Sequence, residues 1–163
     1  MKYEYREVHN KPAATVIKMY GYQKLFERKY KDSGDWNIVV LECDKSKKKF
    51  RIKWRYSIKS SNPNIPALAT KFVGDSSTIT QTDTWDLIAK TGRLDVEIKG
   101  VPVKVGADMV LKDEAKGGVN LLKWNVSCGI PLIGGKLEQL IVDDIKSKSA
   151  QDVAVTVKIL ADY

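Results

Sequence analysis

Residues 50–59 read FRIKWRYSIK, and the alternation within this stretch decides the class of fold. Apolar and aromatic side chains occupy every second position, and most of the positions between them are cationic. Such a pattern predicts a β-strand with one face against a core and the other face in water. The inward set is Phe50, Ile52, Trp54, Tyr56 and Ile58.

The same period of two recurs outward from this strand in both directions. It predicts further strands over residues 36–44, 78–88, 94–98, 101–111 and 119–130, and the β-favouring aromatic residues of 2–8 predict another. Their spacing and the short turns between them favour a curved antiparallel meander. Before the second strand, a period of 3.6 predicts helices over Ala13–Tyr20 and Gln23–Lys31, with Pro12 in the first helical turn and Asn10 or Lys11 at its cap. Residues 60–66 (SSNPNIP) are expected to form a loop, and Ala67–Val73 one short helical turn.

The C-terminal segment after Gly134-Gly135 has the features of a long amphipathic helix of nearly thirty residues. Leu137, Ile141 and Ile145 recur at steps of four residues, and the stripe continues to Leu160. The element order β-α-α-β6-α therefore predicts an α+β fold in which a curved antiparallel sheet of about seven strands wraps on this helix. A long helix rarely fills the concave side of such a sheet, and an apolar ligand would lie in the space that remains.

Four stretches of the chain carry a resemblance to a known family. They are HNKPAATVIKMY (9–20), TQTDTWDL (80–87), GVPVKVGADMVL (100–111) and IPLIGGKLEQL (130–140). In this order the chain resembles the START-like (SRPBCC, helix-grip) superfamily, and within it an uncharacterised bacterial group known as a domain of unknown function. The resemblance implies one START-like domain over residues 1–163 and a cavity for a hydrophobic small molecule, such as a lipid, a polyketide or an isoprenoid-like compound. It supplies no catalytic residues.

Nine inward positions are candidates for the ligand-binding lining: Trp54, Tyr56, Gln81, Asp83, Trp85, Met109, Trp124, Leu137 and Ile141. Gln81 and Asp83 share the apolar side of their strand, where a carboxylate is costly unless it is paired or protonated. Asp83 is thus a candidate polar anchor, or an acid or base in a cyclase-like or hydrolase-like enzyme. A bulge that turns Asp83 to solvent and a pairing Lys or Arg remain alternatives, as does plain core packing for the aromatic residues.

The net charge of +8 is concentrated in the first sixty residues, which carry +9, whereas the remainder carries −1. Six cationic residues in the turn and on the outward face of the 50–59 strand form a candidate surface for anions or anionic membrane: Lys47, Lys48, Lys49, Arg51, Lys53 and Arg55. A plain solvated face is the alternative. Nucleic acid is an unlikely partner, because this face lacks the exposed aromatics that single-strand binders use for stacking.

Several classes of site have no support in the sequence. His9 is the sole histidine and suits a structural role, no metal-ligand spacing or phosphate-binding glycine motif is present, and no cofactor is expected. Cys43 and Cys128 are predicted to be reduced core residues. The charged start of the chain and the lack of a long apolar run favour a cytoplasmic protein, expected as a monomer or weak dimer. The sequence does not identify an enzyme.

Overall fold

The computed structural model describes residues 1–59 and 74–163. The predicted loop at 60–66 and the predicted helical turn Ala67–Val73 lie outside the described residues. Within the described ranges, the α+β class and the element order β-α-α-β6-α are confirmed.

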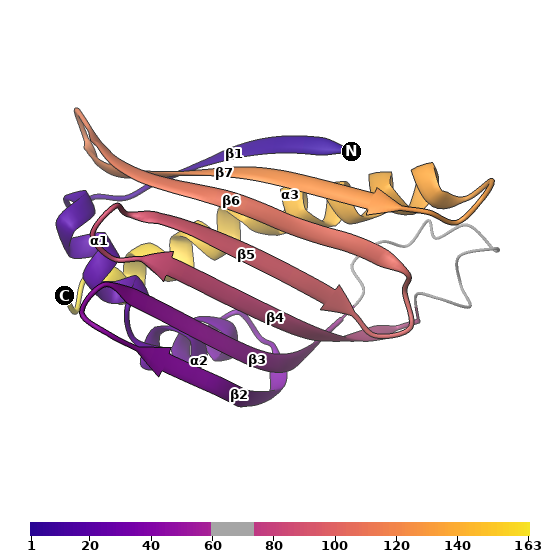
Figure 1. Cartoon of the computed structure of the whole chain (residues 1–163), viewed down its shortest axis with the longest axis horizontal. Coiled ribbons are helices and arrows are strands. Elements are labelled where there is room, and N and C mark those ends of the chain that lie inside the picture. The colour runs from indigo at the N-terminus through magenta and orange to yellow at the C-terminus, as the bar shows by residue number, and fades with distance from the viewer. Residues whose placement is uncertain (60–73) are drawn as a thin grey trace.

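In the part of the chain that the structure describes, seven strands form one antiparallel sheet in the order β1-β7-β6-β5-β4-β3-β2 (Figure 1). The strands are β1 (Lys2–Val8), β2 (Trp36–Lys45), β3 (Lys49–Lys59), β4 (Ser76–Asp86), β5 (Thr91–Ile98), β6 (Val103–Glu114) and β7 (Gly117–Cys128). Consecutive strands from β2 to β7 are neighbours, as in a meander, and β1 joins the far edge beside β7. The alternation predicted for β3 is present, because Phe50, Ile52, Trp54 and Tyr56 are buried.

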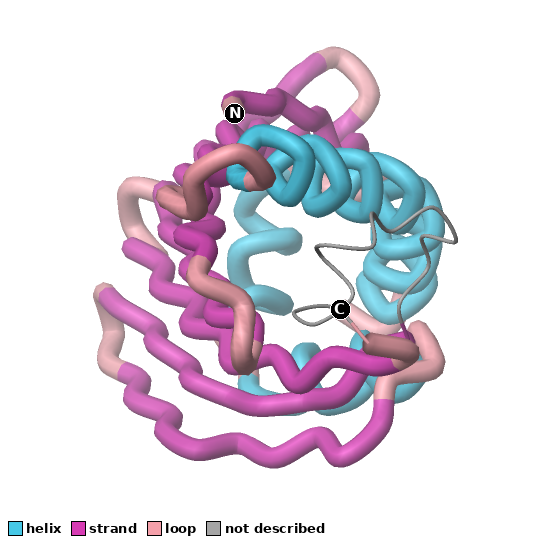
Figure 2. The backbone as a smooth tube through the Cα atoms, turned by 90° about the vertical axis from the view of Figure 1, so that its right-hand side faces the viewer, coloured by secondary structure: helices cyan, strands magenta, loops and turns pink. Residues whose placement is uncertain are grey.

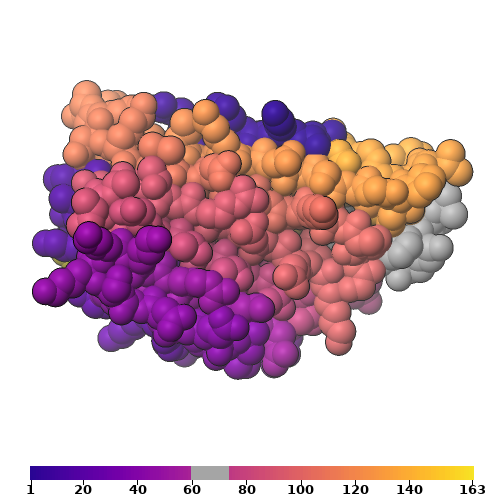
Figure 3. Space-filling view, in the orientation of Figure 1, coloured from indigo at the N-terminus to yellow at the C-terminus, as the bar shows by residue number. Residues whose placement is uncertain are grey.

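In residues 1–59 and 74–163, three helices accompany the sheet: α1 (Ala13–Tyr20), α2 (Gln23–Asp32) and the 27-residue α3 (Gly134–Leu160). Seen along its length, the sheet curls around the helices (Figure 2). From the outer side, the strands cover most of α3 (Figure 3). The main core lies between the concave face and the helices, which is the helix-grip arrangement that the sequence predicted.

The hairpin between β6 and β7 is tighter than predicted. The sequence predicted strands over residues 101–111 and 119–130, but Glu114 pairs with Gly117, so only two residues connect the strands. Gly117 has a positive φ of 133°, a conformation that side-chain-bearing residues rarely adopt. Gly117 therefore lets the hydrogen-bonded pairing of β6 and β7 continue to the end of the hairpin.

The predicted cap of α1 is wrong. Pro12, rather than Asn10 or Lys11, occupies the N-cap position and makes no side-chain cap bond. The backbone N–H of Ala13 instead donates to Asp113 Oδ1 at 2.7 Å, so a residue of β6 satisfies the start of the helix.

The core location predicted for the cysteines is wrong for Cys43, which is exposed, and Cys128 is half-buried. Cys43 lies in β2, the strand at one edge of the sheet. Two irregularities in the register between β2 and β3 interrupt the alternation there, and β2 carries several exposed apolar side chains.

Candidate functional site

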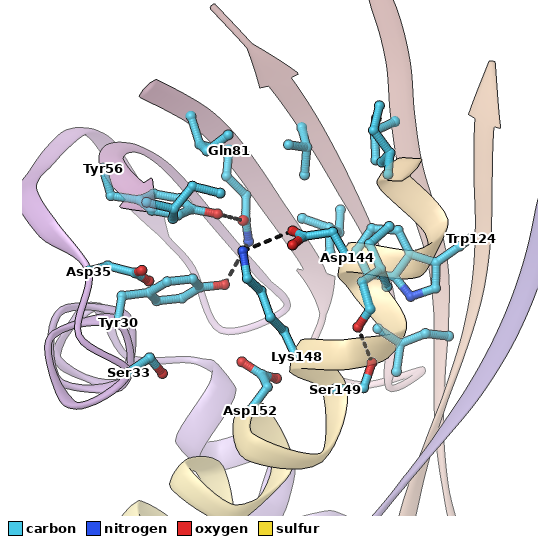
Figure 4. A pocket seen from close by; sticks show the side chains of 18 of the residues that line it. Tyr30, Ser33, Asp35, Tyr56, Gln81, Trp124, Asp144, Lys148, Ser149 and Asp152 are labelled. Atoms are coloured by element: carbon cyan, nitrogen blue, oxygen red, sulfur yellow. Dashed lines mark hydrogen bonds and ion pairs between the residues drawn. The ribbon is translucent and has the colours of Figure 1, made fainter. Parts of the chain in front are cut away.

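A cavity of about 340 Å³ lies between the concave face of the sheet and α3 (Figure 4). Most of its wall is apolar. Many of the apolar side chains come from β5, β6, β7 and α3, and these include Leu94, Val96, Ile98, Val105, Met109, Leu122, Leu137, Leu140, Ile141 and Ile145. Tyrosines, carboxylates and lysines interrupt this wall at a few places, which is the composition typical of small-molecule sites.

The structure brings eight of the nine predicted lining residues to this cavity: Tyr56, Gln81, Asp83, Trp85, Met109, Trp124, Leu137 and Ile141. Trp54 is the exception. Its ring lies behind the wall, with centroids 3.9 Å from Tyr30 and 4.3 Å from Tyr56. These two tyrosines line the cavity in its place, because α2 lays Tyr30 over the inner face of β3.

Gln81 is the centre of a hydrogen-bond network on the cavity wall (Figure 4). Its Oε1 accepts from the Tyr56 hydroxyl at 2.8 Å, while its Nε2 donates to Asp83 Oδ2 at 2.8 Å and to the Tyr30 hydroxyl at 3.2 Å. Because the Asp83 carboxylate can only accept, it fixes which end of the Gln81 amide is the NH₂ group. Trp54 Nε1 donates to the same Oδ2 at 3.2 Å from behind the wall.

Asp83 points inward and is buried, with 5% of its surface exposed. The bulge that would turn it to solvent is absent, since Asp83 pairs in regular register with Ile52 and Leu94. Burial raises the pKa of this carboxyl to about 6, and the bonds from Gln81 and Trp54 oppose that shift only in part. Asp83 is therefore a buried acceptor held by neutral donors.

A second polar group at the cavity comes from β1, α1, α2, β7 and α3. Lys29 Nζ lies 2.8 Å from Asp152 Oδ2. Beside them, Glu7 Oε2 accepts from the Tyr20 hydroxyl at 3.2 Å and from Asn120 Nδ2 at 3.0 Å. Burial is the main cause that raises the pKa of Glu7.

The sequence predictions did not include the residues of this second group, although weak signals for them exist. In β1, Glu7 continues the period-two series of Tyr3 and Tyr5. In α2, Lys29 lies four residues after Leu25 and so shares its buried face. A buried charge is rare enough that such positions are normally assigned to solvent.

Two further ionisable residues line the cavity beside Tyr30. Lys148 of α3 extends toward the sheet and pairs with Asp144 Oδ2 at 2.8 Å (Figure 4). Asp35 is half-buried, which raises its pKa to about 6, although the nearby charge of Lys148 opposes this shift.

His9 is a core residue and does not line the cavity. It is fully buried, and its ring nitrogens have no hydrogen-bond partner among the described residues. Its Nε2 lies 4.0 Å from Glu7 Oε2. Burial lowers the pKa of the ring to about 4, which keeps it neutral at physiological pH.

The six cationic residues of the predicted anion surface lie in the β2–β3 turn and on β3, and none of them lines the cavity. Lys47, Lys48, Lys49 and Arg55 are exposed, and Lys53 is half-buried. Arg51 is paired with Glu42 at 2.5 Å across β2 and β3, so part of this charge is neutralised locally. Binding of an anionic membrane by this surface stays a prediction.

Over residues 1–59 and 74–163, no cluster of three or more histidine, cysteine or acidic side chains has the arrangement of a metal site. In the same ranges, no helix has both the length and the apolarity required to cross a membrane.

Solved structures share this fold at low sequence identity. Zhui aromatase/cyclase from Streptomyces sp. R1128 superposes with a TM-score of 0.65 at 10% identity, covering 99% of this chain and 93% of that one. Ara h 8.0201 superposes with a TM-score of 0.64 at 14% sequence identity, covering 100% of this chain and 99% of that one. TTHA0849 from Thermus thermophilus superposes with a TM-score of 0.62 at 14% sequence identity, covering 98% of this chain and 94% of that one. At these identities the likeness establishes the fold alone.

No curated protein matches the chain. The sequence pattern of the family described as "Protein of unknown function (DUF2505)" matches residues 4–160, almost the whole chain. The chain belongs to the DUF2505 family and has the helix-grip fold of the START-like superfamily.

Proposed function

We propose that this protein binds a hydrophobic small molecule in the cavity between the sheet and α3. The observation that carries the proposal is the cavity itself, about 340 Å³ with a mainly apolar wall. A wall of this kind gains free energy when an apolar ligand replaces water, at roughly 25 cal/mol for each Å² of apolar surface buried. The few polar groups on the wall would orient the ligand.

The names of two structural neighbours agree with this proposal in kind. One is an aromatase/cyclase, and another is a di-domain aromatase/cyclase from a biosynthetic pathway. A lipid, a polyketide or an isoprenoid-like compound would each suit the apolar wall of this cavity. We propose the class that these share, a largely apolar body with few polar groups.

The test is uptake of an environment-sensitive apolar dye by the purified protein, with two tryptophan substitutions compared. Val96→Trp places an indole in the cavity, because Val96 lines it. Val110→Trp is the matched control, because Val110 lies on the outside of β6 with 41% of its surface exposed. We expect Val96→Trp to weaken dye binding by about tenfold or more, and Val110→Trp to leave it unchanged. Equal binding by both variants, or no uptake by the unsubstituted protein, would contradict the proposal.

A second candidate function is a cyclase-like or hydrolase-like reaction in the same cavity. It is favoured by one observation: Asp83 lines the cavity with a pKa raised to about 6, near the range suited to a general acid or base at neutral pH. An Asp83 carboxyl that titrates at its ordinary value in an NMR experiment would remove this candidate.

A further inference from the structure

One region of the cavity wall, here called the polar end, consists of Glu7, Lys29, Asp83, Asn120 and Asp152. All five residues line the cavity. They come from β1, α2, β4, β7 and α3, so the region is formed only when the sheet closes on the helices. Lys29 and Asp152 act electrostatically on both Glu7 and Asp83, and Asn120 donates a hydrogen bond to Glu7, so the five side chains are neighbours.

The polar end has more negative than positive groups. Lys29 is its one cation, and the ammonium hydrogen-bonds to Asp152. Glu7 and Asp83 accept hydrogen bonds from neutral donors only: Tyr20 and Asn120 for Glu7, and Gln81 and Trp54 for Asp83. Among the described residues, no lysine or arginine nitrogen lies within 4.0 Å of either carboxyl group. The ring of His9, 4.0 Å from Glu7, is neutral.

Asn120 adds an independent observation. Its side chain is buried, with 1% of its surface exposed, and its Nδ2 donates to Glu7. Its Oδ1 has no hydrogen-bond partner in the part of the chain that the structure describes. Buried acceptors are nearly always paired, so this unpaired oxygen of a cavity-lining residue is an acceptor available to a donor on a bound molecule.

We propose that the polar end binds the protonated amine of an otherwise apolar ligand. The inference rests on the proposed function and specifies its ligand class. An ammonium group donates up to three hydrogen bonds and supplies a cation in direct contact with the carboxyl groups, which Lys29 does not because it pairs with Asp152. A carboxylate would add another negative charge and another acceptor beside Asn120 Oδ1, and a hydroxyl would donate only one bond. Burial raises the pKa of both Glu7 and Asp83, and the charge of Lys29 opposes this shift without an ion pair to either carboxyl group.

The experiment compares octylamine, octan-1-ol and octanoate, three probes with one apolar chain and different polar ends, by displacement of the apolar dye at neutral pH. We expect octylamine to bind most tightly and octanoate most weakly, because charge interactions are strong in a partly buried site. The ratio of the affinity for octylamine to the affinity for octanoate should be at least about tenfold. Asp83→Asn and Glu7→Gln each remove one carboxylate while nearly keeping its shape. Both are expected to reduce the ratio to within about threefold, and a melting curve identifies a variant that fails to fold.

Asp108→Asn is the matched control for charge. Asp108 lies on the exposed side of β6, paired with Arg93 at 2.9 Å, and this substitution makes the same change in net charge outside the cavity. In Asp108→Asn, the ratio of the affinities for octylamine and octanoate should stay as in the unsubstituted protein.

The outcomes separate the two proposals. If octanoate binds as tightly as octylamine, or if Asp108→Asn lowers the ratio as much as Asp83→Asn, the inference is wrong and the proposed function stands. If none of the three probes and no apolar dye binds, both are wrong.

Discussion

The ammonium of Lys29 lies 2.8 Å from the Asp152 carboxylate and joins α2 to the C-terminal half of α3 at the cavity wall. Lys29 is buried, and its pKa is raised because the attraction of Asp152 and other acidic groups exceeds the cost of burial. The pair therefore links α2 to α3. Its removal leaves a buried cation without its partner.

We expect Asp152→Asn to lower the free energy of unfolding by about 3 kcal/mol, since loss of one member of a buried ion pair typically costs about 3–5 kcal/mol and Asp152 is a third exposed. Urea denaturation measures this effect. Asp143→Asn, on the exposed side of the same helix, is the control and should change stability by less than about 0.5 kcal/mol. Similar losses in the two variants would show that the ion pair is not what holds α3.

The titration of Asp83 predicts a pH dependence of known sign. Its pKa is about 6 in the folded chain and about 4 when unfolded, so the folded chain binds more protons between these values. The contribution of Asp83 to the free energy of unfolding is therefore fully present below about pH 4 and is lost as the pH rises through 6. Relative to the unsubstituted protein, Asp83→Asn should gain roughly 2–3 kcal/mol of stability between pH 4 and pH 6. Denaturation at a series of pH values measures the difference, and a constant difference would contradict the prediction.

The titration of His9 contributes to the pH dependence of stability with the opposite sign. Its pKa is lowered to about 4 by burial, so the folded chain binds fewer protons than the unfolded chain between about pH 4 and pH 6.5. The contribution of His9 is thus present above the upper value and is lost as the pH falls through 4. Because the chain has one histidine, the ring signal in an NMR titration is unambiguous, and its midpoint should lie near 4. A midpoint near 6.5 would mean that the ring is accessible to water.

The two glycines at the start of α3 should respond differently to alanine. A Cβ at Gly134 would lie 2.5 Å from the backbone oxygen of Cys128, whereas a Cβ at Gly135 would meet nothing within 4 Å. Gly134→Ala must push the helix away from β7 and should cost about 1–3 kcal/mol. Gly135→Ala, which adds a better helix former in open space, should be neutral or slightly stabilising. Thermal unfolding of the pair tests this, and equal effects would contradict it.

The sequence by itself determined the faces of the strands and the order of the elements. Alternation is local, so the pattern from Phe50 to Ile58 was enough to place these side chains inward, and the same period placed Gln81 and Asp83 on the cavity side. The stripe of Leu137, Ile141 and Ile145 likewise indicated the long helix, because residues four apart share a helix face.

Only the tertiary structure decided which side chains meet across the cavity. Tens of residues along the chain separate Glu7, Lys29, Asp83 and Asp152 from one another. No local sequence pattern indicates that they line the same cavity. The same holds for Asp113 at the start of α1 and for Trp54, which Tyr30 covers from another element. Periodicity fixes the direction of a side chain within its own element. The curvature of the sheet and the position of the helices fix its neighbours, and these depend on packing of the whole chain.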